Sequence, residues 1–377
     1  MSESYGFLST YPPTECGLAT FTASLVAALG EGPRPCRVGV VQVLDGEGAP
    51  RAREVVHQMD KSARGSLGAA RALDRFDVAV VQHEYGIYGG RDGAAVLAVA
   101  GRVHAPMVVV LHTVLTKPTA HQRMVLEELA RLASSVVVMT ETAHRRLTEG
   151  YDVDPAKVEV IAHGAPTEWR TGQRRAGAAV PSMLTWGLLG PGKGIEWVLD
   201  ALVELQDLSP APHYVVAGGT HPHIAAREGE AYRAALADRA SRRGIRGAVT
   251  FIDRYLPRDE LHSLVQAADV VLLPYDSTDQ VTSGVLIEAV TARRPVVATG
   301  FPHATDLLST GAGIIVARQD ARAIADAVRR ILTEPATSAS MVAAAERLAP
   351  HLTWAAVAAR YRHLGARLHR PSVPASA

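Results

Sequence analysis

Short apolar runs rich in valine and isoleucine alternate along the chain with longer amphipathic stretches. This alternation is typical of βα units that build a parallel sheet, and it does not fit a sandwich or a helical bundle. In the first half it predicts strands over 5–10, 37–44, 54–59, 78–84, 107–113, 135–140 and 158–163. A second series is predicted over 182–188, 213–218, 248–253, 269–275, 295–299 and 313–317. The pattern therefore indicates two doubly wound α/β domains.

A stretch without sustained periodicity separates the two series. Residues 165–181 contain glycine, arginine and two prolines. We predict an N-terminal domain over 1–167, a linker over 168–180 and a C-terminal domain over 181–350. The chain then continues into a predicted amphipathic helix over 353–368 and a frayed tail over 369–377. Two domains also agree with the length of 377 residues, which exceeds what one hydrophobic core usually supports.

The composition argues against several classes of protein. The 39 lysines and arginines balance 38 acidic residues to a formal net charge of +1, which gives no broad positive field for a nucleic acid or an anionic membrane. No apolar run approaches the roughly 18 residues that span a bilayer, so we expect peripheral membrane contact at most. The first ten residues lack a basic segment followed by an apolar stretch, which favours the cytoplasm. Two cysteines, Cys16 and Cys36, are too few for a disulfide framework or a structural zinc site, so we expect free thiols.

Polar residues gather where the predicted strands end. In open α/β sheets, ligands bind outside the carboxyl ends of the strands, near the point at which the winding reverses. In the first domain these ends include His83, His112 and His163, and three histidines at such positions indicate a ligand-facing edge rather than packing alone. In the second domain the equivalent positions are 187–194, 218–221, 253–255 and 275–284.

The loop GLLGPGKGI at 187–195 is a candidate anion site. It joins a predicted strand to a predicted helix, so its backbone N–H groups and the positive end of the helix face a ligand. Lys193, one of only four lysines among 39 basic residues, adds a point charge. The spacing from Gly187 to Lys193 also matches the start of a P-loop, but Gly194 stands where a magnesium-binding Ser or Thr is needed. We predict phosphate binding, and we keep as alternatives a nucleotide hydrolase and a structural glycine turn.

Glu288 lies in an apolar helical run, VLIEAV. A buried carboxylate must find hydrogen-bond donors or raise its pKa, because an unpaired buried charge is costly. Sugar hydroxyls would supply such donors, and an arginine such as Arg294 is the structural alternative. The amides of Gly284 and Val285, at the start of the same predicted helix, form a second candidate site for an anion or a hydroxyl.

Eight segments occur in an order and spacing that are specific as a set: STYPPTECGLATFT, VVQHEYGIYGG, LHTVL, VIAHGA, GLLGPGKGIEWVLDAL, AGGTHP, FIDRYLPRDELHSLVQAADVVLLPY and TSGVLIEAVTARRPVVATG. The set resembles the retaining, nucleotide-sugar-dependent glycosyltransferases of family 4, and the resemblance covers nearly the whole chain. It implies the GT-B fold, in which two Rossmann-like doubly wound domains face each other across a cleft. It also implies that the helix over 353–368 crosses back onto the first domain.

The resemblance implies a donor site in the second domain. Lys193 matches the lysine that binds the donor diphosphate, and Gly187 begins its loop. Glu288 matches the second acid of a paired-glutamate motif and would bind the nucleotide ribose. The remaining donor positions are a stretch whose amides would face the phosphate and sugar, Ser283, Gly284 and Val285, and a loop that would border the nucleobase, Arg254, Tyr255 and Leu256.

The first domain would hold the acceptor. By resemblance, His112 would lie beside the donor sugar, and Gly17 would belong to the loop that closes over the phosphate. His83, Glu84 and Tyr85 are candidates for the acceptor side. For His83 and Glu84, a satisfied polar pair at a strand end is an equal alternative.

The chain departs from the family pattern at two positions. The first acid of the paired motif is here Gln280, and the arginine that usually follows the strand glycine is here Leu188. An amide can still bind a sugar hydroxyl, but it lacks the charge that would stabilise an oxocarbenium-like transition state. Asp276 or Asp279 could replace the acid, and Arg254 could replace the cation.

We expect no metal cofactor. Asp152 and Asp154 form a D-x-D motif, but the motif lies in a polar turn before a proline, which indicates a helix stop. His221 and His223 lack a third ligand at a useful spacing for zinc.

The sequence thus predicts a retaining, metal-independent hexosyltransferase. The expected donor is a nucleotide sugar, with GDP-mannose as our hypothesis and UDP- and dTDP-sugars as alternatives. The expected acceptor is a glycan, a lipid-linked sugar or a small molecule, and no nucleic-acid partner is expected. A catalytically silent nucleotide-sugar-binding subunit and a P-loop-like hydrolase remain the alternatives, and the oligomeric state cannot be predicted.

Overall fold

The computed structural model describes residues 3–32, 34–44, 46, 48, 51–61, 65–166 and 180–369. The chain divides into two compact units: unit 1 is Met1–Gly164 with Trp354–Ala377, and unit 2 is Ala165–Thr353. The predicted linker lies outside the described residues except for residue 180, and the predicted tail does so except for His369.

Unit 1 is built on a seven-stranded parallel sheet with the order β3-β2-β1-β4-β5-β6-β7. The winding reverses between β1 and β4, which are neighbours in the sheet although two strands separate them in sequence. The strands are β1 (Ser4–Ser9), β2 (Arg37–Val43), β3 (Val55–Met59), β4 (Val78–His83), β5 (Met107–Leu111), β6 (Ser135–Val138) and β7 (Val158–Val160).

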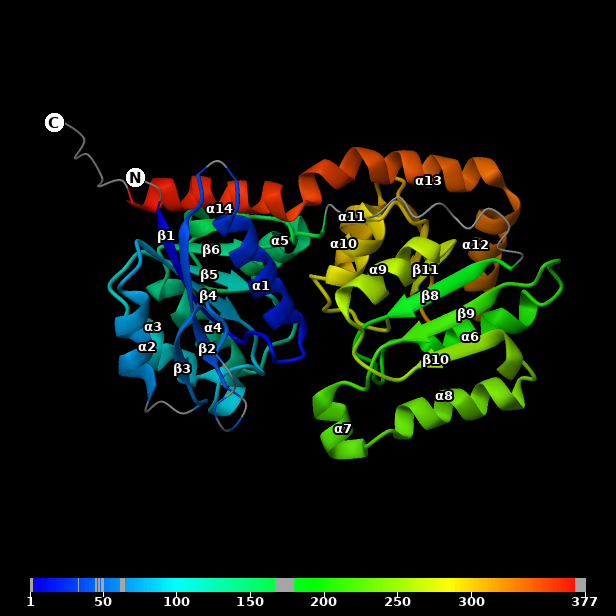
Figure 1. Cartoon of the computed structure of the whole chain (residues 1–377), viewed down its shortest axis with the longest axis horizontal. Helices are drawn as coiled ribbons and strands as arrows, with labels where there is room; N and C mark the ends of the chain where they lie inside the picture. The colour runs from blue at the N-terminus through cyan, green and yellow to red at the C-terminus, as the bar shows by residue number, and fades with distance from the viewer. Residues whose placement is uncertain are drawn as a thin grey trace. The chain divides into compact units, whose positions relative to one another are not determined.

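The helices of unit 1 are α1 (Gly17–Gly30), α2 (Ser66–Leu73), α3 (Ala95–Ala100), α4 (Ala120–Leu132), α5 (Glu141–Gly150) and α14 (Trp354–His369). α14 packs against α1, far from it in sequence (Figure 1). Arg362 fixes this contact, since its Nη2 donates to the carbonyls of Ala28, Leu29 and Glu31 at the end of α1, at 2.9, 3.1 and 3.0 Å. The predicted helix over 353–368 is therefore part of unit 1.

Unit 2 has a six-stranded parallel sheet with the order β10-β9-β8-β11-β12-β13. Its strands are β8 (Ser182–Trp186), β9 (His213–Ala217), β10 (Val249–Ile252), β11 (Val270–Leu273), β12 (Val296–Thr299) and β13 (Gly313–Val316). Its helices are α6 (Ile195–Glu204), α7 (Pro222–Glu228), α8 (Ala231–Arg242), α9 (Arg258–Ala267), α10 (Gly284–Thr291), α11 (Pro302–Leu308), α12 (Ala321–Thr333) and α13 (Pro335–Leu348).

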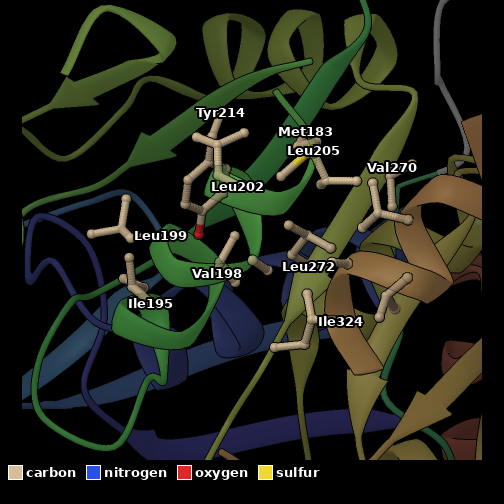
Figure 2. Close-up of a cluster of buried hydrophobic side chains, with 14 of the residues drawn as sticks. Met183, Ile195, Val198, Leu199, Leu202, Leu205, Tyr214, Val270, Leu272 and Ile324 are labelled. Carbon is tan, nitrogen blue, oxygen red and sulfur yellow. The ribbon is translucent and has the colours of Figure 1, made fainter. Parts of the chain in front are cut away.

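The core of unit 2 lies between the sheet and the helices α6, α8 and α12. Val198 and Leu202 of α6 meet Leu272 of β11 and Ile324 of α12 there (Figure 2). Tyr214 is fully buried in the same cluster and donates through its hydroxyl to Thr185 Oγ1 at 2.8 Å, so its one polar atom is satisfied. This packing fixes α6, and with it the loop that precedes α6.

Each predicted strand appears in the described residues, and all but β3 and β12 end one to three residues earlier than predicted. The strand predicted over 107–113, for example, ends at Leu111, and of the backbone amides after it only that of His112 still donates to β4, to the carbonyl of His83 at 3.1 Å. The shortened ends place the polar residues in loops at the carboxyl edge of each sheet.

A helix that could span a membrane is absent from the part of the chain that the structure describes.

Candidate functional site

Three glycines shape the loop between β8 and α6 in unit 2. Gly187, Gly192 and Gly194 have φ angles of 111°, 86° and 67°, which L side chains rarely adopt. A Cβ on Gly194 would also lie 1.9 Å from the carbonyl oxygen of Pro274, the residue after β11. The loop is thus bound closely to the end of the neighbouring strand, and Gly194 cannot be the Ser or Thr of a P-loop in this conformation.

Lys193 extends from this loop over the ring of Tyr275, with Nζ 4.4 Å from the ring centroid. The side chain is partly buried, and burial lowers the pKa of its amine to about 8. Over the described ranges Lys193 forms no ion pair. The charged amine is therefore stabilised by a cation–π contact with the Tyr275 ring. Because it forms no ion pair with any described residue, it can bind an anion.

Asp276 ties the segment after β11 to the same loop. Its amide donates to the carbonyl of Gly192 at 2.9 Å, and its Oδ2 accepts from Trp197 Nε1 at 3.4 Å. The other carboxylate oxygen, Oδ1, is buried and has no partner among the residues described. Asp276 thus has one oxygen that a ligand could satisfy.

Ser283 forms the N-cap of α10. Its Oγ accepts from the amide of Leu286 at 3.3 Å, and its own amide donates to His303 Nδ1 at 2.7 Å. The family resemblance assigned the amides of Ser283, Gly284 and Val285 to the donor. The Ser283 amide is engaged by His303, so the amides left for a ligand are those of Gly284 and Val285, the first two of the helix.

Glu288 lies one turn further along α10 and is partly buried. Its Oε2 accepts from Trp186 Nε1, the last residue of β8, at 3.2 Å. Burial raises the pKa of the carboxyl to about 7, and the Trp186 hydrogen bond and the charge of Arg258 oppose that rise. The alternative partner Arg294 is engaged elsewhere, since its guanidinium donates to the carbonyls of Ala292, Gln266 and Ala268.

The two positions that depart from the family pattern lie in different surroundings. Gln280 is partly buried in the segment between β11 and α10, and its carbonyl accepts from the amide of His303 at 3.3 Å. Leu188 is partly buried directly after Gly187. Asp279, a candidate replacement for the missing acid, lies beside Gln280 in the same segment and is partly buried.

The segment predicted to border a nucleobase follows β10. Tyr255 is 42% exposed, Leu256 is buried, and Arg254 forms an ion pair with Glu260. Arg254 is therefore already paired and is not an unengaged replacement cation. A Cβ on Gly219, in the loop after β9, would lie 3.7 Å from the Tyr255 amide nitrogen, so the two loops are neighbours.

Arg233 of α8, which sequence reasoning missed, holds both loops. Its Nη2 donates to the carbonyl of Gly218 at 2.7 Å and lies 2.9 Å from Asp253 Oδ1. The side chain is 10% exposed, whereas Asp253 is largely exposed. One buried guanidinium thus fixes the ends of β9 and β10 together.

In unit 1, His112 follows β5 and is partly buried. Its Nε2 is 2.6 Å from Gln82 Oε1, and its ring meets the Phe21 ring edge-on with centroids 4.9 Å apart. Burial, together with the neighbouring His163 and His83, lowers the pKa of His112 to about 3. The ring is therefore neutral at physiological pH. His163 contacts the same phenyl ring at 5.0 Å, so two of the three predicted histidines gather around Phe21.

The residues predicted for the acceptor side are engaged within unit 1. His83 is fully buried, burial lowers its pKa to about 4, and its ring packs edge-on against Tyr85 with centroids 4.9 Å apart. Its ring nitrogens have no partner within the described ranges. This histidine was expected at the carboxyl edge of the sheet, with a satisfied polar pair as the equal alternative, and in the structure the Tyr85 ring packs against the imidazole at the end of β4.

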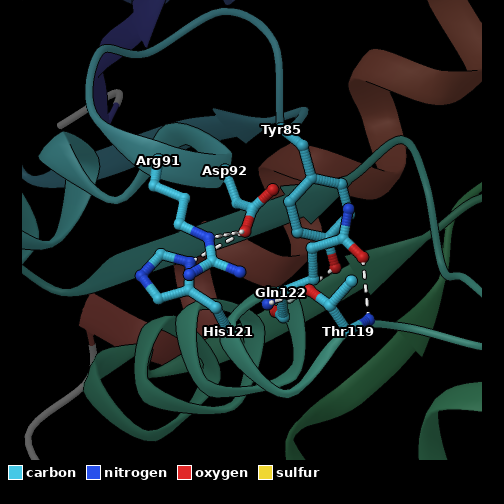
Figure 3. A network of polar contacts seen from close by, with 6 residues as sticks. All are labelled: Tyr85, Arg91, Asp92, Thr119, His121 and Gln122. Carbon is cyan, nitrogen blue, oxygen red and sulfur yellow. Dashed lines mark hydrogen bonds and ion pairs between the residues drawn. The ribbon is translucent and has the colours of Figure 1, made fainter.

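Glu84 accepts from Thr113 Oγ1 at 2.5 Å and from the Tyr85 amide at 2.9 Å, while burial raises the pKa of its carboxyl. The Tyr85 hydroxyl donates to the carbonyl of Gln122 at 3.5 Å. Figure 3 shows Tyr85 above the start of α4, beside the contact of Asp92 with His121 at 2.8 Å. For Glu84, these hydrogen bonds fit the alternative of a satisfied polar residue at a strand end.

Gly17 is the first residue of α1 and is exposed. A Cβ there would meet nothing within 4 Å among the described residues, so none of their contacts requires glycine. Cys16 caps the helix, with Sγ accepting from the Ala19 amide at 3.4 Å, and both cysteines are free thiols.

Of the two metal motifs considered from the sequence, the D-x-D motif contributes to a turn. Asp154 Oδ1 accepts from the Ala156 amide at 2.9 Å and starts the 3₁₀ turn Pro155–Lys157. The His221 amide donates to the carbonyl of Leu189 at 2.8 Å, and the side chain of His223 lies outside the described residues. Among the residues that the structure describes, no group of three His, Cys, Asp or Glu side chains could hold a metal ion.

Comparison with protein families places two known sequence profiles on the chain. The profile described as Glycosyltransferase Family 4 matches residues 17–169, and the profile described as Glycosyl transferases group 1 matches residues 180–334. The first match lies in unit 1 for all but its last residues, and the second lies in unit 2.

Two curated relatives illustrate the sequence similarity. The D-inositol 3-phosphate glycosyltransferase of Corynebacterium diphtheriae is 31% identical over 280 residues, which cover 67% of this chain and 63% of the relative. The alpha-D-kanosaminyltransferase of Streptomyces kanamyceticus is 27% identical over 231 residues, covering 58% of this chain and 56% of the relative. The chain thus spans about three fifths of the length of these relatives.

Solved structures share the fold over nearly the whole chain. Anabaena HepE, in a crystal structure with UDP and glucose, aligns with a TM-score of 0.75 at 15% identity, covering 97% of this chain and 100% of that chain. The sucrose-phosphate synthase of Thermosynechococcus elongatus aligns with a TM-score of 0.74 at 18% identity, covering 97% and 99%. At these identities the likeness establishes the architecture alone.

Proposed function

The chain belongs to the family 4 glycosyltransferases with the GT-B fold, and from that premise we propose that it transfers a sugar from a nucleotide-diphosphate donor to an acceptor hydroxyl. The observation that supports this function best is the position of the Lys193 ammonium group in unit 2. There Lys193 rests on Tyr275, and Tyr275 belongs to the segment that leads into the N-terminus of α10. A lysine and a helix N-terminus on adjoining segments suit the diphosphate of such a donor.

Glu288 would bind the nucleotide ribose. Trp186 occupies Oε2 of its carboxylate and thereby fixes the orientation of the group. Oε1 is then the oxygen that would accept a hydrogen bond from a ribose hydroxyl. The raised pKa of Glu288 agrees with a site that is desolvated before the ligand binds.

We propose that transfer retains the anomeric configuration and needs no metal. The bond from the anomeric carbon to the diphosphate breaks, and the acceptor oxygen bonds to that carbon on the same face. The acceptor proton passes to a diphosphate oxygen, so no side chain acts as a dedicated base. Lys193 and the amides of Gly284 and Val285 would stabilise the charge that develops on the leaving diphosphate.

His112 would contact the donor sugar. Its Nε2 faces Gln82, which leaves Nδ1 for a sugar hydroxyl. Because burial keeps the ring neutral, His112 would act as a hydrogen-bond partner and would bring no positive charge to the reacting carbon. Gln280 would likewise offer an amide to the sugar where the family has a carboxylate.

We propose a GDP-hexose such as GDP-mannose as the donor, and a glycan, a lipid-linked sugar or a small molecule as the acceptor. UDP-sugars are the main alternative, because HepE has been crystallised with UDP-glucose. A catalytically silent nucleotide-sugar-binding subunit is the second candidate function. Gln280 favours that candidate, since it lacks the charge of the usual acid.

Thermal unfolding against a panel of nucleotides tests the proposal. Purified protein is melted with GDP, UDP, dTDP, ADP or ATP, each with and without magnesium. A ligand at 100 times its Kd stabilises a protein by about 2.7 kcal/mol, so the matching diphosphate should raise Tm by several degrees without metal. Stabilisation by ATP and magnesium alone would instead support a nucleotide hydrolase.

Turnover then separates the enzyme from the silent subunit. The donor sugar that corresponds to the stabilising nucleotide is incubated with acceptors, and free nucleotide and product are quantified. Binding without any transfer or donor hydrolysis would favour the silent subunit. Wild-type binding and turnover in both Lys193→Ala and Glu288→Ala would contradict the site assignment.

A further inference from the structure

His303 is a buried histidine that neither the sequence motifs nor the family comparison assigned. It lies in the first turn of α11 and is 3% exposed. Its Nδ1 accepts from the amide of Ser283 at 2.7 Å, and Ser283 is 4% exposed. A short hydrogen bond between two buried groups fixes the direction of the Ser283 amide.

The segment that contains His303 is joined to the segment before α10 at three further points. Thr299 Oγ1 donates to the carbonyl of Tyr275 at 2.5 Å. The Phe301 and Tyr275 rings pack with centroids 5.1 Å apart and an interplanar angle of 31°. The His303 amide donates to the carbonyl of Gln280 at 3.3 Å. Residues 299–303 therefore support residues 275–283 along their length.

The supported segment contains the groups that the proposed function assigns to the donor. Tyr275 lies under Lys193, and Gln280 and Ser283 precede the amides of Gly284 and Val285. Ser283 itself donates through its amide to His303 Nδ1 and accepts through its hydroxyl from the Leu286 amide. Because the amide and the hydroxyl of Ser283 are both hydrogen-bonded, the orientation of Ser283 is fixed. The direction of the Gly284 and Val285 amides that follow is fixed with it.

We infer that His303 is a positioning residue for the donor diphosphate. By accepting from the Ser283 amide, it fixes the N-terminus of α10 so that the amides of Gly284 and Val285 face the phosphate oxygens. His303 itself makes no contact with the donor. The inference rests on the proposed function, because it presumes a nucleotide diphosphate at α10.

Three substitutions of His303 separate the effect of its hydrogen-bond acceptor from the effect of its side-chain volume. Asn places its Oδ1 about where the histidine has Nδ1, so His303→Asn keeps an acceptor for the Ser283 amide. His303→Leu replaces the imidazole with an apolar side chain of similar size and removes the acceptor. His303→Gln keeps an amide but places its oxygen one bond further out.

The control is His213→Leu, which removes an imidazole from the opposite edge of the same sheet. His213 is the first residue of β9, and its Nε2 lies 2.8 Å from Thr250 Oγ1. This change leaves the carboxyl ends of the strands untouched. It therefore reports what the loss of a hydrogen-bonded histidine does to unit 2 in general.

Donor binding and turnover of the full-length variants test the inference. Calorimetry gives the Kd of the nucleoside diphosphate that stabilises the wild type, and steady-state kinetics give KM for the donor and kcat. We expect His303→Leu and His303→Gln to raise Kd and donor KM about tenfold, as expected for one lost buried hydrogen bond. His303→Asn should stay within about twofold of the wild type, and His213→Leu should not change either constant.

Several results would overturn the inference. Wild-type Kd in a folded His303→Leu variant would do so, and so would equal Kd values for His303→Asn and His303→Gln. If His303→Leu does not fold, the comparison of Kd between His303→Asn and His303→Gln tests the inference. A wild-type protein that binds no nucleoside diphosphate would contradict the proposed function, whereas equal binding by wild type and variants contradicts the inference alone.

Discussion

Lys193 combines a positive charge with a partly buried position, and under the proposed function this combination should make diphosphate binding depend on pH. The pKa of its amine, lowered by burial to about 8, lies within the range in which the protein can be studied. A bound diphosphate favours the protonated amine, so binding above pH 8 must include the uptake of a proton. Affinity should therefore be highest below the pKa and should fall as the pH rises through it.

We predict that the affinity for the nucleoside diphosphate is nearly constant between pH 7 and 7.5 and falls by up to about tenfold per pH unit above 8. Calorimetric titrations between pH 7 and 9.5 measure this fall. Lys193→Arg is the matched control, because the pKa of an arginine side chain is above about 12. A wild-type affinity that stays flat to pH 9.5, or a fall of equal size in Lys193→Arg, would contradict the role of the amine.

Single residues differ in how far their surroundings could be predicted. Lys193 and Glu288 were singled out because a lysine in an arginine-rich chain and an acid in an apolar helix are visible locally. Trp186, Arg233 and His303 were missed, since each acts through a contact with a residue 15 to 102 positions away. A signal existed for His303, which follows a buried strand directly after a proline in GFPHA.

For His83 the sequence left two interpretations, a ligand-facing residue and a satisfied polar residue at a strand end. Which of them holds depends on the part of the chain that covers the strand end. Here the ring of Tyr85 packs against the imidazole, and the side chain has no exposed surface. Sequence spacing cannot reveal that cover, because it depends on how the loop after β4 folds back.

At the scale of elements, the loop between β8 and α6 depends on glycine for two different reasons. Gly192 and Gly194 both have positive φ angles, but a Cβ on Gly192 meets nothing within 4 Å, whereas one on Gly194 lies 1.9 Å from a carbonyl oxygen. Backbone strain is therefore common to both positions. Steric overlap is specific to Gly194.

We predict that Gly192→Ala lowers the free energy of unfolding by about 1–2 kcal/mol, the cost of a left-handed alanine. Gly194→Ala should cost more than about 3 kcal/mol, since the loop and β11 must also separate. Urea unfolding of the two variants measures the difference. Similar losses in both would show that the close approach of Gly194 to Pro274 is not a constraint in solution.

Periodicity predicted the strands well and their ends poorly. Apolar alternation marks a strand while its side chains are buried, and it gives no signal where the hydrogen-bonded ladder stops. Val108 to Leu111 are buried in β5, for example, and His112 directly after them lies in a loop. Some of the residues wrongly included in strands, such as His112 and Tyr275, have roles in the proposed function.

At the scale of the whole molecule, each unit has its own sheet and its own hydrophobic core. The groups proposed for the donor diphosphate and ribose lie in unit 2, and the histidine proposed for the donor sugar lies in unit 1. The pattern alone predicted two domains and a last helix. That this helix, α14, joins unit 1 depends on contacts such as that of Arg362 with α1, which no local periodicity contains.

Amide hydrogen exchange with and without the stabilising nucleoside diphosphate tests the central claim most directly, because it locates the ligand along the whole chain. We predict slower exchange within unit 2 at 187–194 and 275–286, the glycine-rich loop and the segment that leads into α10. The amino ends of the neighbouring strands β9 and β12, at 211–214 and 293–296, should be unchanged. A ligand that stabilises the protein but leaves both segments unprotected would contradict the claim that Lys193 and α10 form the donor site.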